Sequence, residues 1–149
     1  MNPAFPLYIP SKGRADSRLT AKALERMGVP FRVVVEEHEK QVYVDALGDA
    51  SKVIVLDPQY QRDYDTFDDL GDTKSKGPGA ARNFIWDHSI SEGHAWHWVM
   101  DDNIKAFFRL NRNLKVPVSD GTIFRAMEDF CQRYTNVMMA GPNYFMFAS

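Results

Sequence analysis

The sequence predicts an α/β domain in which a mostly parallel central sheet is covered by helices on both faces. Short apolar runs alternate with helical patterns along the first 100 residues, as in sheets built from strand–helix–strand units. The most conspicuous polar residues follow directly after these runs, at the sheet edge where α/β proteins bind ligands. The length of 149 residues suits one domain, spanning residues 1–149.

Strands are predicted wherever β-branched or other apolar residues form a short run. The first four runs cover residues 7–9, 31–35, 52–56 and 96–100. The fourth run is apolar except at His97, which predicts a central strand covered on both faces. Further strands are expected over residues 104–110 and 136–140.

Helices are predicted where apolar residues recur at helical spacing between start and stop signals. The first follows a cap at Asp16 or Ser17 and stops at Gly28. The second covers residues 39–47, and Gly48 ends it. The third lies between the Gly-Pro-Gly of residues 77–79 and Gly93, and the fourth follows a cap at Ser119 or Asp120. The polar residues 59–76 are expected to form a solvated loop, and loops of that length are often functional.

Composition and charge narrow the class of protein. The formal net charge is -2, so the total gives no support to non-specific gripping of a nucleic-acid backbone. The single cysteine, Cys131, cannot form a disulfide framework within the chain and fits a reducing compartment. No apolar run approaches the roughly 18 residues of a membrane span, and the N-terminus lacks a signal-peptide pattern. A cytoplasmic protein without a membrane partner is therefore expected.

A candidate metal site follows the fourth strand, where Asp101, Asp102 and Asn103 come in succession. Carboxylate and amide oxygens are hard ligands of the kind that Mg²⁺ or Mn²⁺ binds together with phosphate oxygens and water. The alternative is that adjacent acidic residues only cap a turn.

A candidate anion site lies at the start of the third helix, at Gly79, Arg82 and Asn83. Unpaired amides at a helix start attract anions, and glycine lets a ligand approach the backbone. The planar guanidinium of Arg82 suits a phosphate or a carboxylate. The alternative is an ordinary helix start with Arg82 in a structural ion pair.

The other strand ends add further candidates for binding a nucleotide. Ser11, Lys12 and Arg14 follow the first strand, Glu36 the second and Asp57 the third. The glycine spacing after the first strand excludes a P-loop. Its hydroxyl and basic groups could still hold a base, ribose or phosphate, or they could form a polar surface turn.

Three segments together resemble a known family. YIPSKGR (residues 8–14), GPGAARNFIWDHS (77–89) and WHWVMDDNI (96–104) resemble the TET-associated glycosyltransferases. These are GT-A-fold nucleotide-diphospho-sugar transferases, encoded mainly by bacteriophages beside genes for pyrimidine modification in DNA. The resemblance covers most of the chain and is most specific over residues 77–104.

The resemblance implies a GT-A-like (Rossmann-like) three-layer sandwich and a nucleoside-diphosphate-sugar donor, with UDP-sugars favoured. It places the residues after the first strand near the nucleotide, and Glu36 and Asp57 at the base or ribose. Arg82 and Asn83 would lie near the diphosphate, and Asp101 would begin the Asp-x-Asp metal motif. Asn103 departs from the third position of that motif. This leaves open whether Asp102 or, more weakly, Asn103 holds the metal, or whether a metal is needed.

The acceptor implied by the family is a hydroxymethylated pyrimidine in phage DNA. Arg109, Arg112, Lys115 and Arg125 could form a basic face for it. An inverting transferase also needs a carboxylate base. Asp120, Glu128 and Asp129 follow the metal motif, but none is identified as that base. GT-A enzymes are generally longer, so the acceptor half is expected to be incomplete or truncated at the C-terminus.

Two other classes of protein remain open at this point. A non-catalytic nucleotide-sugar-binding fragment would bind the donor without transferring or hydrolysing it. A sugar-phosphate nucleotidyltransferase would consume a nucleoside triphosphate and release pyrophosphate.

Overall fold

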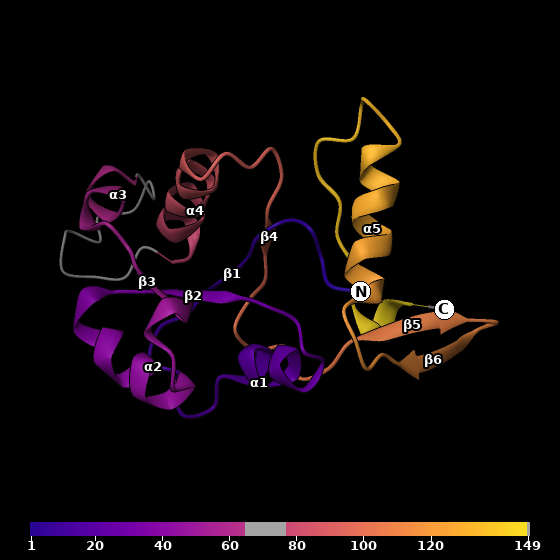
Figure 1. The fold of residues 1–149 in the computed structure, drawn as a ribbon, viewed down its shortest axis with the longest axis horizontal. Helices are drawn as coiled ribbons and strands as arrows, with labels where there is room; N and C mark the ends of the chain where they lie inside the picture. Colours follow the sequence, from indigo (N-terminus) through magenta and orange to yellow (C-terminus); the bar gives the residue numbers. More distant parts are fainter. Residues whose placement is uncertain (65–76, 149) are drawn as a thin grey trace.

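The computed structural model describes residues 1–64 and 77–148, and it contains the predicted α/β sheet (Figure 1). Its four strands are β1 (Leu7–Pro10), β2 (Arg32–Val35), β3 (Val53–Val55) and β4 (Trp98–Val99). They are hydrogen-bonded in the order β3-β2-β1-β4. All three pairings are parallel, so the carboxyl ends of the strands meet at one edge of the sheet.

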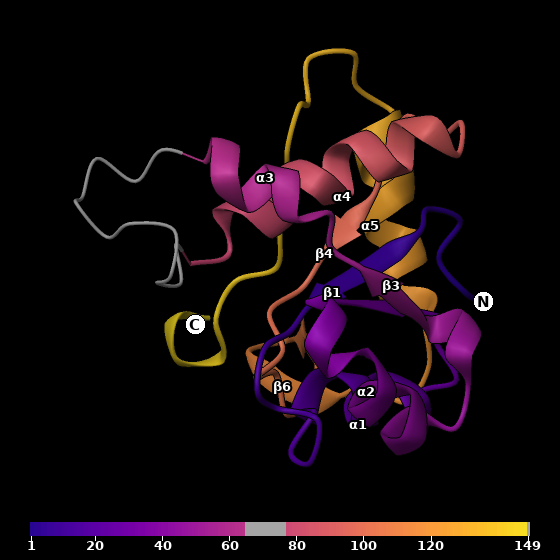
Figure 2. The same ribbon diagram turned by 90° about the vertical axis from the view of Figure 1, so that its left-hand side faces the viewer.

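Helices cover both faces of this sheet, as predicted. Figures 1 and 2 show α1 (Leu19–Arg26) and α2 (Lys40–Leu47) on one face, and α3 (Pro58–Asp63) and α4 (Gly79–Ser91) on the other. The core is divided in the same way, because successive strand residues point to opposite faces. Val33 packs in the larger cluster beside α1 and α2, whereas its neighbour Val34 packs in the smaller cluster beside α4.

The predicted ends of the first two helices are confirmed at their carboxyl ends. Gly28 and Gly48 follow α1 and α2 with φ of 67° and 69°, the left-handed conformation that glycine adopts without a steric penalty. The predicted cap of α1 is wrong. Arg18 precedes the helix without a side-chain cap bond, and its guanidinium donates instead to the carbonyl of Ala15 at 2.8 Å.

Part of the predicted loop after β3 is helical. Residues 58–63 form α3, which begins at a proline and is capped by the carboxylate of Asp57 through the amide of Gln59 at 2.9 Å. Proline at the first helical position and Asp at the cap both favour a helix start. This signal was overlooked because the residues that follow are mostly polar. The rest of that predicted loop, residues 65–76, lies outside the described residues.

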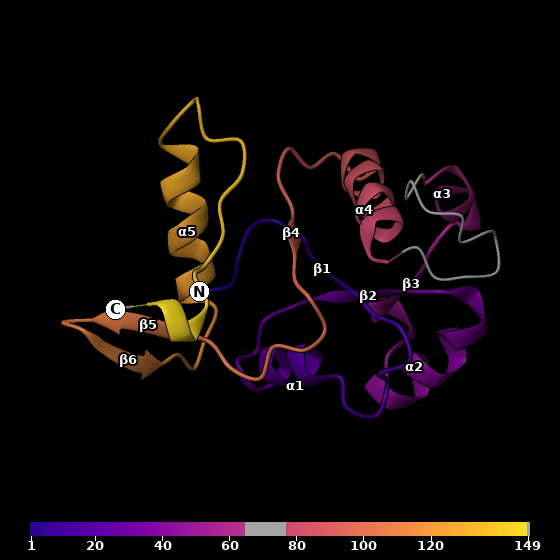
Figure 3. The same cartoon turned by 180° about the vertical axis from the view of Figure 1, so that it is seen from behind.

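The fourth strand is shorter than predicted and is not central. In the described part of the chain, β4 pairs only with β1 and forms the edge of the sheet. Helix α5 (Thr122–Gln132) lies beyond it where a further strand was expected (Figures 1 and 3). Trp98 of β4 packs edge-to-face on Phe124 of α5, with ring centroids 5.5 Å apart, so a helix covers this edge.

Of the strand predicted over residues 104–110, only residues 108–110 are in a strand, and that strand belongs to a separate hairpin. β5 (Phe108–Asn111) and β6 (Leu114–Pro117) form a two-stranded antiparallel sheet outside the main one. Arg112 and Asn113 connect them with φ of 49° and 65°, as in the tight turns whose twist matches that of a hairpin.

The C-terminal part differs from the prediction in one element. The carboxylate of Asp120 accepts the amide of Thr122 at 2.9 Å at the start of α5, although Gly121 is the residue directly before the helix. Residues 136–140, predicted as a strand, form none. Met138 and Met139 in this segment are each 85% exposed, because no strand of the sheet lies beside them. None of the described helices is long and apolar enough to span a membrane.

Candidate functional site

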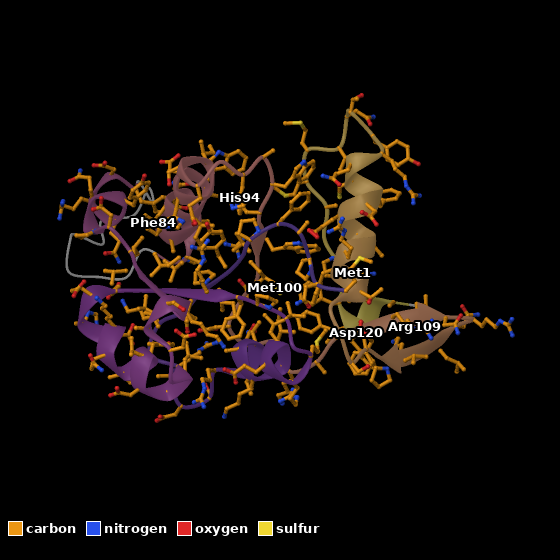
Figure 4. The ribbon with its side chains drawn as sticks, viewed as in Figure 1. Met1, Phe84, His94, Met100, Arg109 and Asp120 are labelled. Atoms are coloured by element: carbon orange, nitrogen blue, oxygen red, sulfur yellow. The ribbon has the colours of Figure 1, made fainter. Side chains whose placement is uncertain are left out.

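The carboxyl edge of the sheet brings several candidate residues together, because those after β1, β2 and β4 each follow a parallel strand. β1 leads into Ser11, Lys12 and Arg14, β2 into Glu36, and β4 into Asp101 and Asp102 by way of Met100. Met100 is buried and lies near the middle of the molecule (Figure 4). Backbone bonds fix these strand ends, among them Ser11 N–H to Val34 O at 3.0 Å and Met100 N–H to Tyr8 O at 3.0 Å.

Asp102 is held on both of its carboxylate oxygens. Arg14 Nη1 donates to Oδ1 at 2.7 Å, and the hydroxyl of Ser11 donates to Oδ2 at 2.8 Å. The side chain of Asp102 is only 15% exposed. Ser11 and Arg14 of the β1 loop and Asp102 of the β4 tip therefore form one hydrogen-bonded group, in which Asp102 is the acceptor.

Asp101 is the more accessible of the two acidic residues, with 54% of its side chain exposed. Arg82 in the first turn of α4 approaches it, with Nη2 2.8 Å from Oδ1. Arg82 does form an ion pair, as the structural alternative proposed, but its partner is the first candidate metal ligand. The pair therefore places a half-exposed guanidinium and a half-exposed carboxylate next to one another at the ligand-binding edge.

The start of α4 has the features of an anion site only in part. Pro78 precedes the helix and has no side-chain group that could accept one of its first-turn amides. Gly79 is closely approached, but by the ring of Tyr64: a Cβ at this position would overlap the ring. Asn83 borders a hollow between α3 and α4 that it shares with Tyr60 and Trp86. Figure 4 shows Phe84, the next residue of α4, in the region between these helices.

Glu36 receives donors from the loop after β1 and from helix α3. Lys12 Nζ lies 3.2 Å from Oε1, and Gln61 of α3 donates to the same oxygen at 2.6 Å. His38 Nδ1 lies 3.5 Å from Oε2. Partial burial raises the pKa of this carboxyl, but the hydrogen bonds from Gln61 and Lys12 outweigh it and hold the pKa below its ordinary value. Asp57, the candidate after β3, is engaged separately as the cap of α3.

The fit of a divalent metal depends on Asp101. No group of three His, Cys, Asp or Glu side chains that could hold an ion occurs among residues 1–64 and 77–148. Both oxygens of Asp102 are already hydrogen-bonded, whereas Asp101 and Asn103 are exposed at the surface. One open carboxylate with an adjacent amide fits an ion of the Mg²⁺ type, which needs few protein ligands when phosphate and water complete its shell.

The three carboxylates that follow the metal motif, Asp120, Glu128 and Asp129, make their described contacts away from Asp101 and Asp102. Glu128 is buried at 2% exposure, and its carboxylate accepts the amides of Ala4 and Phe5 at 2.6 to 3.0 Å. Asp129 pairs with Arg125 at 3.4 Å, and Asp120 accepts the amide of Thr122. These contacts give all three carboxylates structural partners in or beside α5.

Two of the four side chains of the possible basic face, Lys115 and Arg125, have partners within the chain. Lys115 Nζ donates to the carbonyl of Phe145 at 2.6 Å and lies 4.3 Å from the centre of its ring, and Arg125 pairs with Asp129. Arg109 is exposed on β5 (Figure 4), and Arg112 is exposed at the hairpin turn.

Two residues that contact the site were missed in the sequence. Tyr43 of α2 is 1% exposed, and its hydroxyl lies 2.6 Å from Ser11 Oγ. Thr20 of α1 is fully buried and contacts the backbone of Asp101. Both positions read as ordinary core residues of amphipathic helices. The only available signal was a hydroxyl on an otherwise apolar helix face.

A family model, TET-Associated Glycosyltransferase, matches residues 5–149. No curated protein and no solved structure matches the chain with significance. The family match spans the sheet, the site edge and α5, and it agrees with the resemblance of the three sequence segments. The chain belongs to the TET-associated glycosyltransferase family.

Proposed function

We propose that this chain binds a nucleoside-diphosphate sugar, with UDP-sugars favoured, at the carboxyl edge of a GT-A-type sheet and transfers the sugar to an acceptor hydroxyl. The family name indicates a glycosyltransferase. The observation that carries the finer proposal is the pairing of Arg82 with the exposed Asp101, 2.8 Å apart, at the ligand-binding edge. A donor diphosphate and its counter-ion need these two charges side by side.

Sugar transfer breaks the bond between the anomeric carbon and a diphosphate oxygen, and it forms a bond from that carbon to the acceptor oxygen. The acceptor proton leaves to a base, and negative charge grows on the departing diphosphate. Arg82 is half exposed, so its guanidinium can turn from Asp101 to the diphosphate and stabilise that charge. A divalent ion such as Mn²⁺ or Mg²⁺, bound at Asp101 with support from Asp102 or Asn103, would supply further neutralisation when present.

The loop after β1 and the end of β2 are proposed to hold the nucleoside. Lys12 has 53% of its side chain exposed, so it can leave Glu36 for a phosphate. Glu36 then offers a carboxylate acceptor to a ribose hydroxyl or a base N–H, and its lowered pKa keeps it ionised at neutral pH. Ser11 and Arg14 stay on Asp102 and shape the loop.

The proposed acceptor is a hydroxymethylated pyrimidine of phage DNA in the cytoplasm of the host cell. The family's association with pyrimidine modification supports this choice. Arg109 and Arg112, both exposed on the hairpin, are proposed to contact a nucleic-acid phosphate.

A non-catalytic nucleotide-sugar-binding module is the second candidate function. It is favoured by one observation, namely that Asp120, Glu128 and Asp129 all have structural partners in or beside α5. Such a module would bind the donor with the same residues. Incubation with radiolabelled UDP-sugar and hydroxymethylated DNA separates the two: product on the DNA supports the transferase.

Substitution of Arg82 and of Asp101 tests the donor site. Arg82→Ala removes the fork proposed to bind the diphosphate, and a charge-assisted hydrogen bond contributes about 1.5–3 kcal/mol. We therefore expect UDP affinity, measured by calorimetry with Mn²⁺, to fall about 10- to 150-fold. Asp101→Ala should weaken Mn²⁺-dependent UDP binding in the same way.

The matched control is another exposed Arg–Asp pair, Arg125 and Asp129 on α5. Arg125→Ala and Asp129→Ala remove the same charges away from the sheet edge and should leave UDP affinity unchanged. Unchanged UDP binding in both Arg82→Ala and Asp101→Ala would show that this pair is not part of the donor site.

A further inference from the structure

Four residues at the site edge form a closed ring of hydrogen bonds. Arg14 donates from its backbone amide to the hydroxyl of Tyr43 at 3.1 Å, and from its guanidinium to Asp102 Oδ1 at 2.7 Å. Ser11 closes the ring between Tyr43 and Asp102. Its Oγ lies 2.6 Å from the Tyr43 hydroxyl and 2.8 Å from Asp102 Oδ2. The ring joins α2, the β1 loop and the tip of β4.

The direction of every hydrogen bond in this ring is fixed by chemistry. An ionised carboxylate only accepts, so the hydroxyl proton of Ser11 points to Asp102. A backbone amide only donates, so Arg14 N–H uses the oxygen of Tyr43, and the Tyr43 proton goes to Ser11 Oγ. Tyr43 must be neutral for this, and burial raises the pKa of its hydroxyl. Tyr43 is thus the residue that orients the hydroxyl of Ser11 toward Asp102.

A second buried hydroxyl holds the backbone of the same turn. Thr20 Oγ1 donates to the carbonyl of Asp101 and accepts the amide of Ile104 at 2.9 Å. The Thr20 amide also lies 3.4 Å from the carbonyl of Asp102. Helix α1 therefore fixes both ends of the turn that carries Asp101 and Asp102.

We propose that Tyr43 and Thr20 are positioning residues, which set the affinity of the site for a nucleoside diphosphate without contacting it. The inference rests on the proposed function. Tyr43 holds the Asp102 side chain through Ser11, and Thr20 holds the backbone on which Asp101 stands. A site whose polar groups are already oriented loses less conformational freedom on binding, and so binds more tightly.

The test compares Tyr43→Phe with Tyr8→Phe in the full chain. Both tyrosines are buried, with exposures of 1% and 0%, and both hydroxyls are hydrogen-bonded. Tyr8 lies on the other face of the sheet, where its hydroxyl contacts His88 at 2.9 Å and Arg32 at 3.0 Å. Each variant removes one buried hydroxyl, so both should lower the melting temperature.

Only Tyr43→Phe should weaken binding of UDP in the presence of Mn²⁺. We expect a rise in Kd of roughly 3- to 10-fold, the loss that one hydrogen bond produces, against less than twofold for Tyr8→Phe. Thr20→Val should also raise the Kd, and Thr20→Ser, which keeps the hydroxyl, should restore the parent value. A role in stability alone would give the same small change in UDP binding for Tyr43→Phe and Tyr8→Phe.

A double substitution identifies the route through Ser11. Ser11→Ala breaks the link between Tyr43 and Asp102, so Tyr43→Phe should add little to it, whereas independent effects would multiply. Parent-like UDP binding by both Tyr43→Phe and Thr20→Val overturns this inference and leaves the donor site in place. Absence of UDP binding by the parent protein overturns the proposed function, and this inference with it.

Discussion

Substitution of Glu128 should destabilise the fold while leaving the donor site intact. This carboxylate is 2% exposed and fixes the segment that leads into β1, through the amides of Ala4 and Phe5. Because β1 lies between β2 and β4 in the sheet, loosening this segment affects the centre of the domain. Glu128 is also one of the carboxylates that follow the metal motif, none of which is identified as the base, so the same variant tests a catalytic role as well.

The magnitude follows from the groups left without a partner. Glu128→Ala leaves two partly buried amide donors unpaired, at about 1–3 kcal/mol each. Solvent can reach part of this segment, so we expect a loss of about 3 kcal/mol in the free energy of unfolding. For a domain of about 150 residues this lowers the melting temperature by about 6–12 °C. Glu128→Gln retains one acceptor oxygen and should cost less.

Calorimetric unfolding and UDP titration of the same samples check this prediction. Asp129→Asn is the control: the neighbouring carboxylate is exposed in a surface ion pair, and its loss should cost about 0.5 kcal/mol or less. A Glu128→Ala protein as stable as this control would refute the structural role. Full stability and full UDP binding in Glu128→Gln, together with lost sugar transfer, would instead identify Glu128 as the base.

Two further predictions concern the carboxyl end of helix α2 and the loss of stability at acid pH. Gly48→Ala places a Cβ in the left-handed conformation after α2, at φ 69°, and should cost about 1 kcal/mol in urea unfolding; an unchanged midpoint would contradict this. The pKa of Glu36 is below its unfolded value, so its stabilisation is present above about pH 4.5 and is lost as pH falls through the folded pKa. Glu36→Gln should therefore lose less stability than the parent between pH 5 and 3, and equal losses would contradict the assigned contacts.

The parallel sheet could be predicted from the sequence because its strands and helices depend on local patterns. Valine-rich runs ended at polar residues, and Gly28 and Gly48 ended helices at the positions that their left-handed conformation requires. The position of the candidate residues at one edge followed from parallel pairing alone. These features can be predicted without knowing which residues distant in the sequence are in contact.

The parts of the fold that were predicted wrongly depend on which elements lie beside each other in the structure. The 96–100 run looked like a central strand, but α5 rather than a strand covers its outer edge. The hairpin of β5 and β6, over residues 108–117, was missed because Arg112, not glycine, takes the first positive φ of its turn. Asn113, which tolerates that conformation, was the available signal.

The internal connections of the site could not be predicted either. Tyr43 and Ser11 are 32 positions apart, and Thr20 and Asp101 are 81 apart. Each pair meets only through the packing of a helix on the sheet. The sequence identified the charged residues of the edge, and the structure adds the buried hydroxyls that hold them.

In the proposed function, the carboxyl edge of this sheet binds a nucleoside diphosphate together with a divalent ion. Titration calorimetry of the parent protein with UDP and UDP-sugars, with and without Mn²⁺ and with ATP as the competing nucleotide, measures this binding. We expect micromolar UDP binding that is strengthened by Mn²⁺, with weaker binding of ATP. If no nucleotide binds, with or without the metal, the carboxyl edge is not a nucleotide-binding site.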